Sequence, residues 1–339
     1  MISRFVTTLL GALTIFTPFL PAADEATKEI NILFLGNSYT ARHNMPDLVE
    51  AILEVGDPTT DVHVDRAIYG GQNMFKHSTY YFSHSFIEQS TITNEEIEKR
   101  LAAMRGFLES DTAPNPAEWD QHWASVGKTE VPFADIHSHI TRAIANHEAL
   151  LKNNPKTQWD YVVLQSWRDV SSEPNQGYER YATQLAGIAK AQGAEVILYM
   201  TSPETQNQDP VTEPYEPASA ERDTAVGLRM AKALQPKAVI PVPLAIRNIQ
   251  ENGTELVFRY HNDGHPNQTC AYLVANLFYA ALTGKSPEGL AFDTVVENKV
   301  KDGKDPDGGE PTVVFEGEGK AYLQRMADEA VREFLGMAE

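Results

Sequence analysis

ILFLGNSYT, residues 32–40, is an apolar run that breaks at Gly36 and presents Ser38 two positions later. A short continuous apolar run bounded by a glycine is consistent with a strand buried on both faces, as in a parallel sheet. In open sheets of this kind, ligands bind in the crevice at the carboxyl ends of the strands. Ser38 directly follows the first predicted strand, and we therefore expect it at that crevice.

The rest of the chain alternates short β-rich runs with helical patterns, which is typical of a parallel sheet covered by helices on both faces. We predict an α/β fold, a three-layer α/β/α sandwich around a five-stranded parallel sheet in a flavodoxin-like arrangement. The predicted strands are 30–35, 61–68, 161–165, 195–201 and 238–242, and the main predicted helices are 46–53, 178–192, 217–234 and 268–282.

Residues 1–23 have the pattern of a secretion signal. Arg4 precedes an apolar run over 5–19, and the small residues Ala22 and Ala23 offer a cleavage point. The run is shorter than a membrane span requires. We therefore expect an exported protein, periplasmic or extracellular, with no stable membrane insertion after cleavage; an uncleaved anchor is the alternative.

We divide the remainder into one large domain over 24–290 and a C-terminal extension over 291–339 that ends in a predicted helix. The domain carries an insertion, about 79–156, between the second and third strands, with helical patterns at 94–108 and 134–151. A segment this long is more typical of a cap or a substrate-shaping element than of a plain connector. Five aromatic residues of the insertion could stack on sugar rings, although core packing is their commoner fate: Tyr80, Tyr81, Phe82, Trp119 and Trp123.

The charge balance narrows the class of partner. Lys and Arg number 28 against 47 Asp and Glu, which gives a net charge of −19. Such a surface repels nucleic acid and anionic membranes, and it favours neutral or weakly charged substrates. Cys270 is the only cysteine, so no intramolecular disulfide can form, and we expect this residue to be a small buried hydrophobe.

A second stretch, HNDGHP at 261–266, supplies Asp263 and His265 just before an apolar helical pattern. A serine hydroxyl becomes a nucleophile when a base takes its proton, and the base needs a third group to orient it. Ser38, His265 and Asp263 could supply these three roles. The alternative for Ser38 is a structural turn or a helix cap, but Asn44 is better placed to cap the next predicted helix.

Candidate oxyanion donors follow the second and third strands. Gly70 and Gly71 allow the backbone to approach a ligand and expose an N–H, and an amide aimed at a developing oxyanion lowers the barrier by about 3 kcal/mol. Gln165 ends the apolar third strand with a side-chain amide. The alternatives are a tight turn at Gly71 and a satisfied polar group at Gln165. We expect the N–H groups of Gly71 and Ser38, with the Gln165 amide, to form the oxyanion hole.

In order and context, these pieces resemble the SGNH (GDSL-like) hydrolase superfamily. The turn 36–38 looks like its first block, with Asn37 in place of an aspartate; Gly71 is similar to its second-block glycine, and Gln165 stands where an oxyanion asparagine is usual. Asp263 and His265 resemble the last block. The pattern at 159–165 and at 271–287 looks like a bacterial secreted branch often associated with carbohydrate O-acetylesterases.

The resemblance has two departures. The family spaces its aspartate three residues before the histidine, and Asn262 holds that place here, with Asp263 one step closer. Either Asp263 still reaches His265, or the unit is nearer to a Ser38–His265 dyad. Gln165 is one methylene longer than asparagine and needs a recessed strand end to place its amide.

The resemblance implies a secreted serine esterase that hydrolyses short acyl esters, O-acetyl groups in particular, on a small-molecule or polysaccharide carbohydrate substrate. It implies an acyl-enzyme mechanism that needs no metal and no cofactor. Two alternatives stay open at this point: a catalytically degenerate carbohydrate-binding protein on the same scaffold, and an acyltransferase with the same residues. The natural substrate and the oligomeric state are not specified by the sequence.

Overall fold

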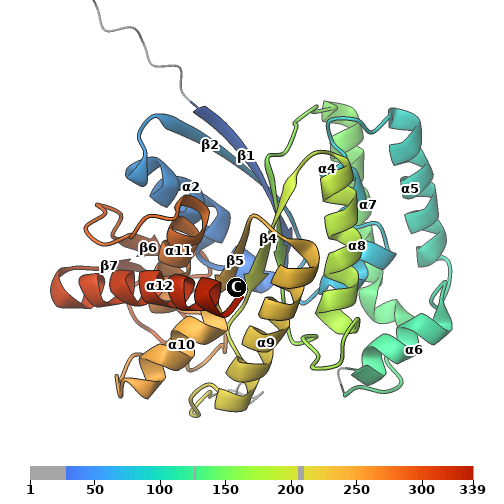
Figure 1. Cartoon of the computed structure of the whole chain (residues 1–339). Coiled ribbons are helices and arrows are strands. Elements are labelled where there is room, and N and C mark those ends of the chain that lie inside the picture. Colours follow the sequence, from blue (N-terminus) through green and yellow to red (C-terminus); the bar gives the residue numbers. More distant parts are fainter. Residues whose placement is uncertain (1–27, 126, 205–209, 339) are drawn as a thin grey trace, which may run out of the picture.

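A five-stranded parallel sheet lies at the centre of the protein (Figure 1). The computed structural model describes residues 28–125, 127–204 and 210–338; the predicted secretion signal, 1–23, lies outside the described residues. The strand order β2-β1-β3-β4-β5 is the flavodoxin-like order, which confirms the predicted fold class. The strands are β1 (Lys28–Gly36), β2 (Thr60–Ile68), β3 (Tyr161–Gln165), β4 (Glu195–Met200) and β5 (Ala238–Pro241).

The strand β1 shows why an uninterrupted apolar run is needed at the centre of this sheet. It pairs in parallel with β2 along one edge and with β3 along the other, so it lies inside the sheet and both of its faces pack against helices. Successive side chains of a strand point to opposite faces. Accordingly, Leu33 and Leu35 belong to one hydrophobic cluster, and Ile32 and Phe34 belong to a second one.

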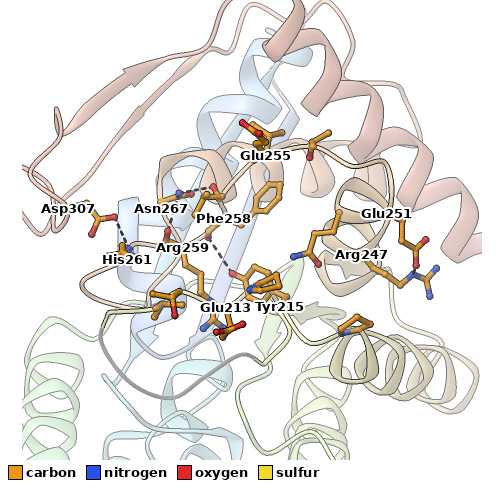
Figure 2. A pocket seen from close by; sticks show the side chains of 18 residues that line it. Glu213, Tyr215, Arg247, Glu251, Glu255, Phe258, Arg259, His261, Asn267 and Asp307 are labelled. Carbon is orange, nitrogen blue, oxygen red and sulfur yellow. Dashed lines mark hydrogen bonds and ion pairs between the residues drawn. The ribbon is translucent and has the colours of Figure 1, made fainter.

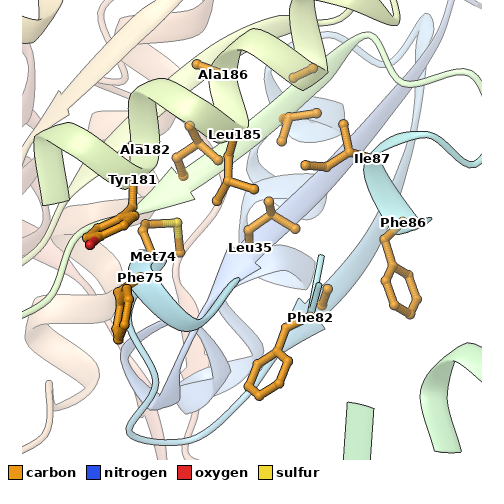
Figure 3. Packing of buried hydrophobic residues seen from close by; sticks show 14 of the residues in the cluster. Leu35, Met74, Phe75, Phe82, Phe86, Ile87, Tyr181, Ala182, Leu185 and Ala186 are labelled. Carbon is orange, nitrogen blue, oxygen red and sulfur yellow. The ribbon is translucent and has the colours of Figure 1, made fainter. Parts of the chain in front are cut away.

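Helices cover the two faces of the sheet (Figure 1). The first cluster includes side chains of α8 and α9, and the second includes side chains of α2, α11 and α12. Figure 3 shows part of the first cluster, with Leu35 of β1 facing Leu185 of α8 and Met74 of α3. These helices are α2 (Met45–Gly56), α3 (Met74–Thr79), α8 (Gly177–Ala191), α9 (Pro217–Leu234), α11 (Gln268–Thr283) and α12 (Gly317–Ala338).

The segment between β2 and β3 is helical and lies on the side of α8 (Figure 1). Tyr80, Phe82 and Trp119 are buried there in the first cluster, so the suggestion that they stack on sugar rings is wrong for these three residues. Tyr81 and Trp123 are half-buried. After α3, the elements of this segment are α4 (His84–Ile87), α5 (Asn94–Leu108), α6 (Pro116–Ser125), the 3-10 turn η2 (Phe133–Ile136) and α7 (His137–Asn153).

The extension after residue 290 adds a small antiparallel pair, β6 (Thr294–Val296) and β7 (Thr312–Val314), before α12. The helix α12 packs on α11, and α10 (Val242–Glu251) fills the space between α9 and α12. Cys270 on α11 is fully buried, as predicted. Within the described ranges, no helix has both the length and the apolar character needed to cross a membrane.

Candidate active site

Ser38 begins α1 (Ser38–Ala41), a single helical turn directly after β1. Asn37 caps this turn, because its side-chain oxygen accepts a hydrogen bond from the Tyr39 N–H at 3.0 Å. The Asn37 side-chain amide donates to the Gln72 carbonyl at 2.8 Å, which ties the turn after β1 to the turn after β2. Asn37 therefore caps the helical turn α1, and the half-buried Ser38 has no capping role.

His265 lies on a loop whose two arms are hydrogen-bonded to each other. The Tyr260 N–H donates to the His265 carbonyl at 2.9 Å, and Arg259 forms an isolated bridge with Pro266. Gly264 turns the loop with a φ of +69°, a conformation that costs glycine little. The apolar helix α11 follows at once and anchors the loop in the core.

The structure brings Ser38, His265 and Asp263 into one hydrogen-bonded chain. The Nε2 atom of His265 lies 2.9 Å from the Ser38 Oγ, and its Nδ1 atom lies 2.5 Å from the Asp263 Oδ1. Asn262 is exposed, and its N–H donates to Asp307 at 2.8 Å. Of Asn262 and Asp263, it is thus Asp263 that contacts the histidine.

Two cations hold the other oxygen of Asp263. Arg42 Nη1 lies 2.7 Å and Lys299 Nζ lies 3.1 Å from the Oδ2 atom. The hydrogen bond from His265 holds the pKa of the Asp263 carboxyl well below its usual range; Arg42 adds to this effect, although partial burial opposes it. Asp263 is therefore a carboxylate at neutral pH, as is required of a group that orients and stabilises an imidazolium.

Residues of the C-terminal extension contact Arg42 and Asn44, which lie next to the site. Arg42 is also paired with the buried Glu297, which follows β6, at 2.9 Å. Asn44 was expected to cap α2, but it has a left-handed φ of 50° and makes no capping bond; its side chain accepts instead from Asn298 at 3.0 Å. Arg42 and Glu297 are 255 positions apart, and no sequence motif links them.

The turn after β2 places Gly71 beside the Ser38 turn. The Gln72 N–H donates to the Tyr69 carbonyl at 3.0 Å, so Gly70 and Gly71 are the central residues of this turn. Gly71 has a φ of +68°, which is the reason for glycine at the third position. Because Asn37 holds the Gln72 carbonyl, the exposed Gly71 lies on the turn next to the candidate nucleophile.

Gln165 differs from the expected oxyanion donor. Its Oε1 atom accepts hydrogen bonds from the Asn37 N–H at 2.8 Å and the Thr40 hydroxyl at 3.0 Å. Its amide nitrogen donates to the Ser166 carbonyl, and the residue is 1% exposed. The longer side chain reaches back to fix the turn that carries Ser38, and its amide group is used there rather than as an oxyanion donor. A Cβ at Gly36 would lie 2.5 Å from this Oε1 atom, which explains the glycine there.

Neither a family model nor a curated protein matches the chain. Among solved structures, a DUF4886 family protein from Bacteroides uniformis aligns over 92% of this chain and 97% of its own, with 13% identity and a TM-score of 0.51. A chain described as "a putative SGNH hydrolase" from Slackia heliotrinireducens aligns over 75% of this chain and 100% of its own, with 17% identity and a TM-score of 0.41. At these identities, the first likeness shows a shared fold and no more.

Proposed function

We propose that the protein is a serine esterase of the SGNH hydrolase type, with Ser38 as nucleophile, His265 as general base and Asp263 as the group that orients His265. The observation that carries the proposal is the unbroken chain of contacts of 2.9 Å and 2.5 Å from the Ser38 hydroxyl through the imidazole to the carboxylate. This chain lies at the carboxyl end of β1, where open α/β sheets bind their ligands.

In the first half of the reaction, His265 Nε2 takes the proton from Ser38 as the Oγ atom attacks the ester carbonyl carbon. The imidazolium that forms is stabilised by the Asp263 carboxylate. The negative charge on the carbonyl oxygen is held by the N–H groups of Ser38 and Gly71. When the tetrahedral intermediate collapses, the alcohol leaves with the proton from His265, and the acyl group stays on Ser38.

In the second half, His265 takes a proton from a water molecule, which attacks the acyl carbon. Collapse of the second intermediate returns the proton to Ser38 and releases the carboxylic acid. If a sugar alcohol replaces this water, the same residues carry out acyl transfer. Every proton transfer in this cycle is assigned to His265, so the cycle includes no metal and no cofactor.

For the substrate, we propose short acyl esters, chiefly O-acetyl groups on extracellular carbohydrate. The support is the resemblance of the sequence blocks to secreted carbohydrate O-acetylesterases, together with the secretion pattern at 1–23. The alternative of a degenerate binding protein was motivated by the shifted Asp263 and by Gln165. The short contact between Asp263 and His265 weighs against it, and Gln165 has a structural role in the turn.

The test is the turnover of 4-nitrophenyl acetate and of acetylated xylo-oligosaccharides by the purified chain, beside Ser38→Ala and His265→Ala. We expect acetate release by the unaltered protein and a loss of at least about 10³-fold in both variants. Turnover that survives in Ser38→Ala would contradict the proposal. Release of acetate with added sugar acceptors, compared with acetylated acceptor formed, separates hydrolysis from transfer.

A further inference from the structure

His77 is a buried histidine of α3 that the proposed mechanism does not use. Its Nε2 atom lies 3.1 Å from the carbonyl oxygen of Gly36, and its Nδ1 atom lies 2.5 Å from the Oγ atom of Ser83. Neither His77 nor Ser83 is exposed to solvent. The imidazole therefore connects a buried hydroxyl to the backbone two positions before the candidate nucleophile, Ser38.

The direction of these two hydrogen bonds follows from the chemistry of the partners. A carbonyl oxygen can only accept, so the Nε2 atom of His77 carries a proton and donates it to Gly36. Burial lowers the pKa of His77 to about 3, so the ring is neutral at pH 7 and has a single N–H. The Nδ1 atom is then an acceptor, and the Ser83 hydroxyl donates to it. Ser83 thus fixes the tautomer that His77 needs in order to hold Gly36.

The peptide unit that joins Gly36 to Asn37 is held at both of its ends. Its carbonyl oxygen accepts from His77 and also from the Tyr69 N–H, the latter at 3.0 Å. Its N–H donates to the Oε1 atom of Gln165 at 2.8 Å. Ser38 is separated from this unit by one residue, so a change in the orientation of the unit is passed directly to the nucleophile.

The loop that carries the general base, His265, is held by contacts of its own. Figure 2 shows one of them, in which the His261 N–H donates to Asp307 at 2.7 Å. A change at His77 should therefore move Ser38 relative to an imidazole that stays in place. The distance it would alter is the 2.9 Å between the Ser38 Oγ atom and the Nε2 atom of His265.

We propose that His77 is a positioning residue of the esterase site: together with Ser83, it holds the Gly36 peptide so that the hydroxyl and the N–H of Ser38 are placed for attack on the ester. The inference rests on the proposed function and adds a residue that does not touch the substrate. A displacement of about 1 Å at a reacting group can lower a rate roughly 10²-fold. Because the alignment matters in the transition state, its loss should lower kcat and leave KM nearly the same.

The experiment measures kcat and KM for 4-nitrophenyl acetate in variants of the full chain. His77→Phe keeps an aromatic ring and removes both hydrogen bonds, but it leaves the Ser83 hydroxyl buried without a partner. The double variant His77→Phe with Ser83→Ala removes that hydroxyl, and the Gly36 carbonyl keeps its bond from Tyr69, so the stability lost in the single variant should largely return. We expect kcat to fall roughly 10- to 100-fold in both, with KM changed less than about 3-fold.

Two further variants serve as the rescue and the control. In His77→Gln, the side-chain amide can donate to the Gly36 carbonyl, so we expect part of the lost kcat to return. His147→Leu is the matched control, since His147 is an equally buried histidine whose hydrogen bond goes to the Ala143 carbonyl on its own helix. It should leave kcat within about 3-fold of the unaltered protein.

A role in packing alone predicts that kcat recovers together with stability in the double variant, and such a recovery would overturn the inference. A loss confined to KM would overturn it as well. Amide hydrogen exchange over residues 36–40, followed by mass spectrometry, is independent of turnover and should be about 10-fold faster in the double variant than in the unaltered protein. If the unaltered protein releases no 4-nitrophenol, the proposed function fails, and the exchange alone decides whether His77 holds the turn; equal exchange in the two proteins would mean that it does not.

Discussion

Asp263 receives hydrogen bonds from three side chains, those of His265, Arg42 and Lys299. Each contact limits the freedom of the carboxylate, so the imidazole of His265 is held with its Nε2 atom toward Ser38. The family's spacing of three residues between aspartate and histidine does not describe this arrangement, because it depends on the shape of the loop. The left-handed Gly264 bends the loop sharply enough to bring an acid two positions away onto the ring.

Asp263→Asn should therefore lower kcat for ester hydrolysis by about 10²- to 10⁴-fold, because the amide supports the wrong imidazole tautomer and no longer stabilises the imidazolium. Steady-state kinetics with 4-nitrophenyl acetate measure this loss. Asn262→Ala is the matched control and should change kcat less than about 3-fold, since Asn262 is exposed and contacts Asp307 through its backbone. A larger effect at Asn262 than at Asp263 would show that the histidine is supported differently in solution.

Among single residues, the sequence predicted Ser38, His265 and Asp263 as a group, and in the structure His265 lies within hydrogen-bond distance of both Ser38 and Asp263. The sequence did not predict the roles of Arg42 and Glu297. The two residues are 255 positions apart, and neither lies in a recognisable motif.

At the level of elements, the turn between β1 and α1 depends on Gln165 at the end of the neighbouring strand β3. Two buried donors, the Asn37 N–H and the Thr40 hydroxyl, share its Oε1 atom. The sequence predicted correctly that a polar side chain ends this strand. The direction of its hydrogen bonds could not be predicted, since it depends on the parallel pairing of β1 with β3 and on the close approach at Gly36.

Gln165→Leu should lower the free energy of unfolding by about 2 to 4 kcal/mol, because it leaves these two buried donors without an acceptor. Urea unfolding followed by circular dichroism measures the change. Thr40→Val removes only one of the two bonds and should cost roughly half as much. If Gln165 instead serves as an oxyanion donor, Gln165→Leu will lower kcat while the unfolding midpoint stays the same.

The helix α7 carries His147, whose Nδ1–H donates to the Ala143 carbonyl at 2.8 Å, while its Nε2 atom has no hydrogen-bond partner among the residues that the structure describes. Burial lowers the pKa of His147 to about 4. Below pH 6.5, the unfolded chain binds a proton that the folded chain binds only near pH 4, so acidification favours unfolding. Between pH 7 and pH 5, this residue alone should cost about 2 kcal/mol of stability.

His147→Leu should accordingly reduce the loss of stability between pH 7 and pH 5 by about 2 kcal/mol relative to the unaltered protein. Urea unfolding at the two pH values gives the difference. The control is His63→Gln, a change at a histidine whose side chain is 58% exposed, which should change the free energy of unfolding at pH 7 by less than about 0.5 kcal/mol. An identical pH dependence in His147→Leu would mean that this histidine titrates normally in the folded protein.

For the whole molecule, the five-stranded parallel sheet with helices on both faces followed from the alternation of β-rich and helical patterns. The short strands β6 and β7 and the role of the C-terminal extension did not. Three-residue strands carry too few residues for a periodic pattern. The helix α12 has a clear apolar face, but its partner α11 can be identified only from the folded chain.

Phe334 of α12 connects the C-terminal helix to the sheet-covering helix α9, with its ring positioned 3.5 Å from where a Cβ on Gly227 would lie. It is 3% exposed. Phe334→Ala should destabilise the fold by about 3 to 5 kcal/mol through lost burial and the cavity left behind. The neighbouring Leu335 is 58% exposed, and Leu335→Ala should change stability by less than about 0.5 kcal/mol; similar midpoints of thermal unfolding for the two variants would contradict the packing of α12.

The central claim is that Ser38 is a nucleophile activated by His265, and covalent labelling tests it most directly. The purified chain is treated with a serine-reactive organophosphonate, digested, and the adduct is located by mass spectrometry, with His265→Ala treated in parallel. The account predicts a single phosphonylated residue, Ser38, and labelling slowed by at least about 10²-fold in His265→Ala. An unmodified Ser38, or labelling at the same rate without His265, would contradict it.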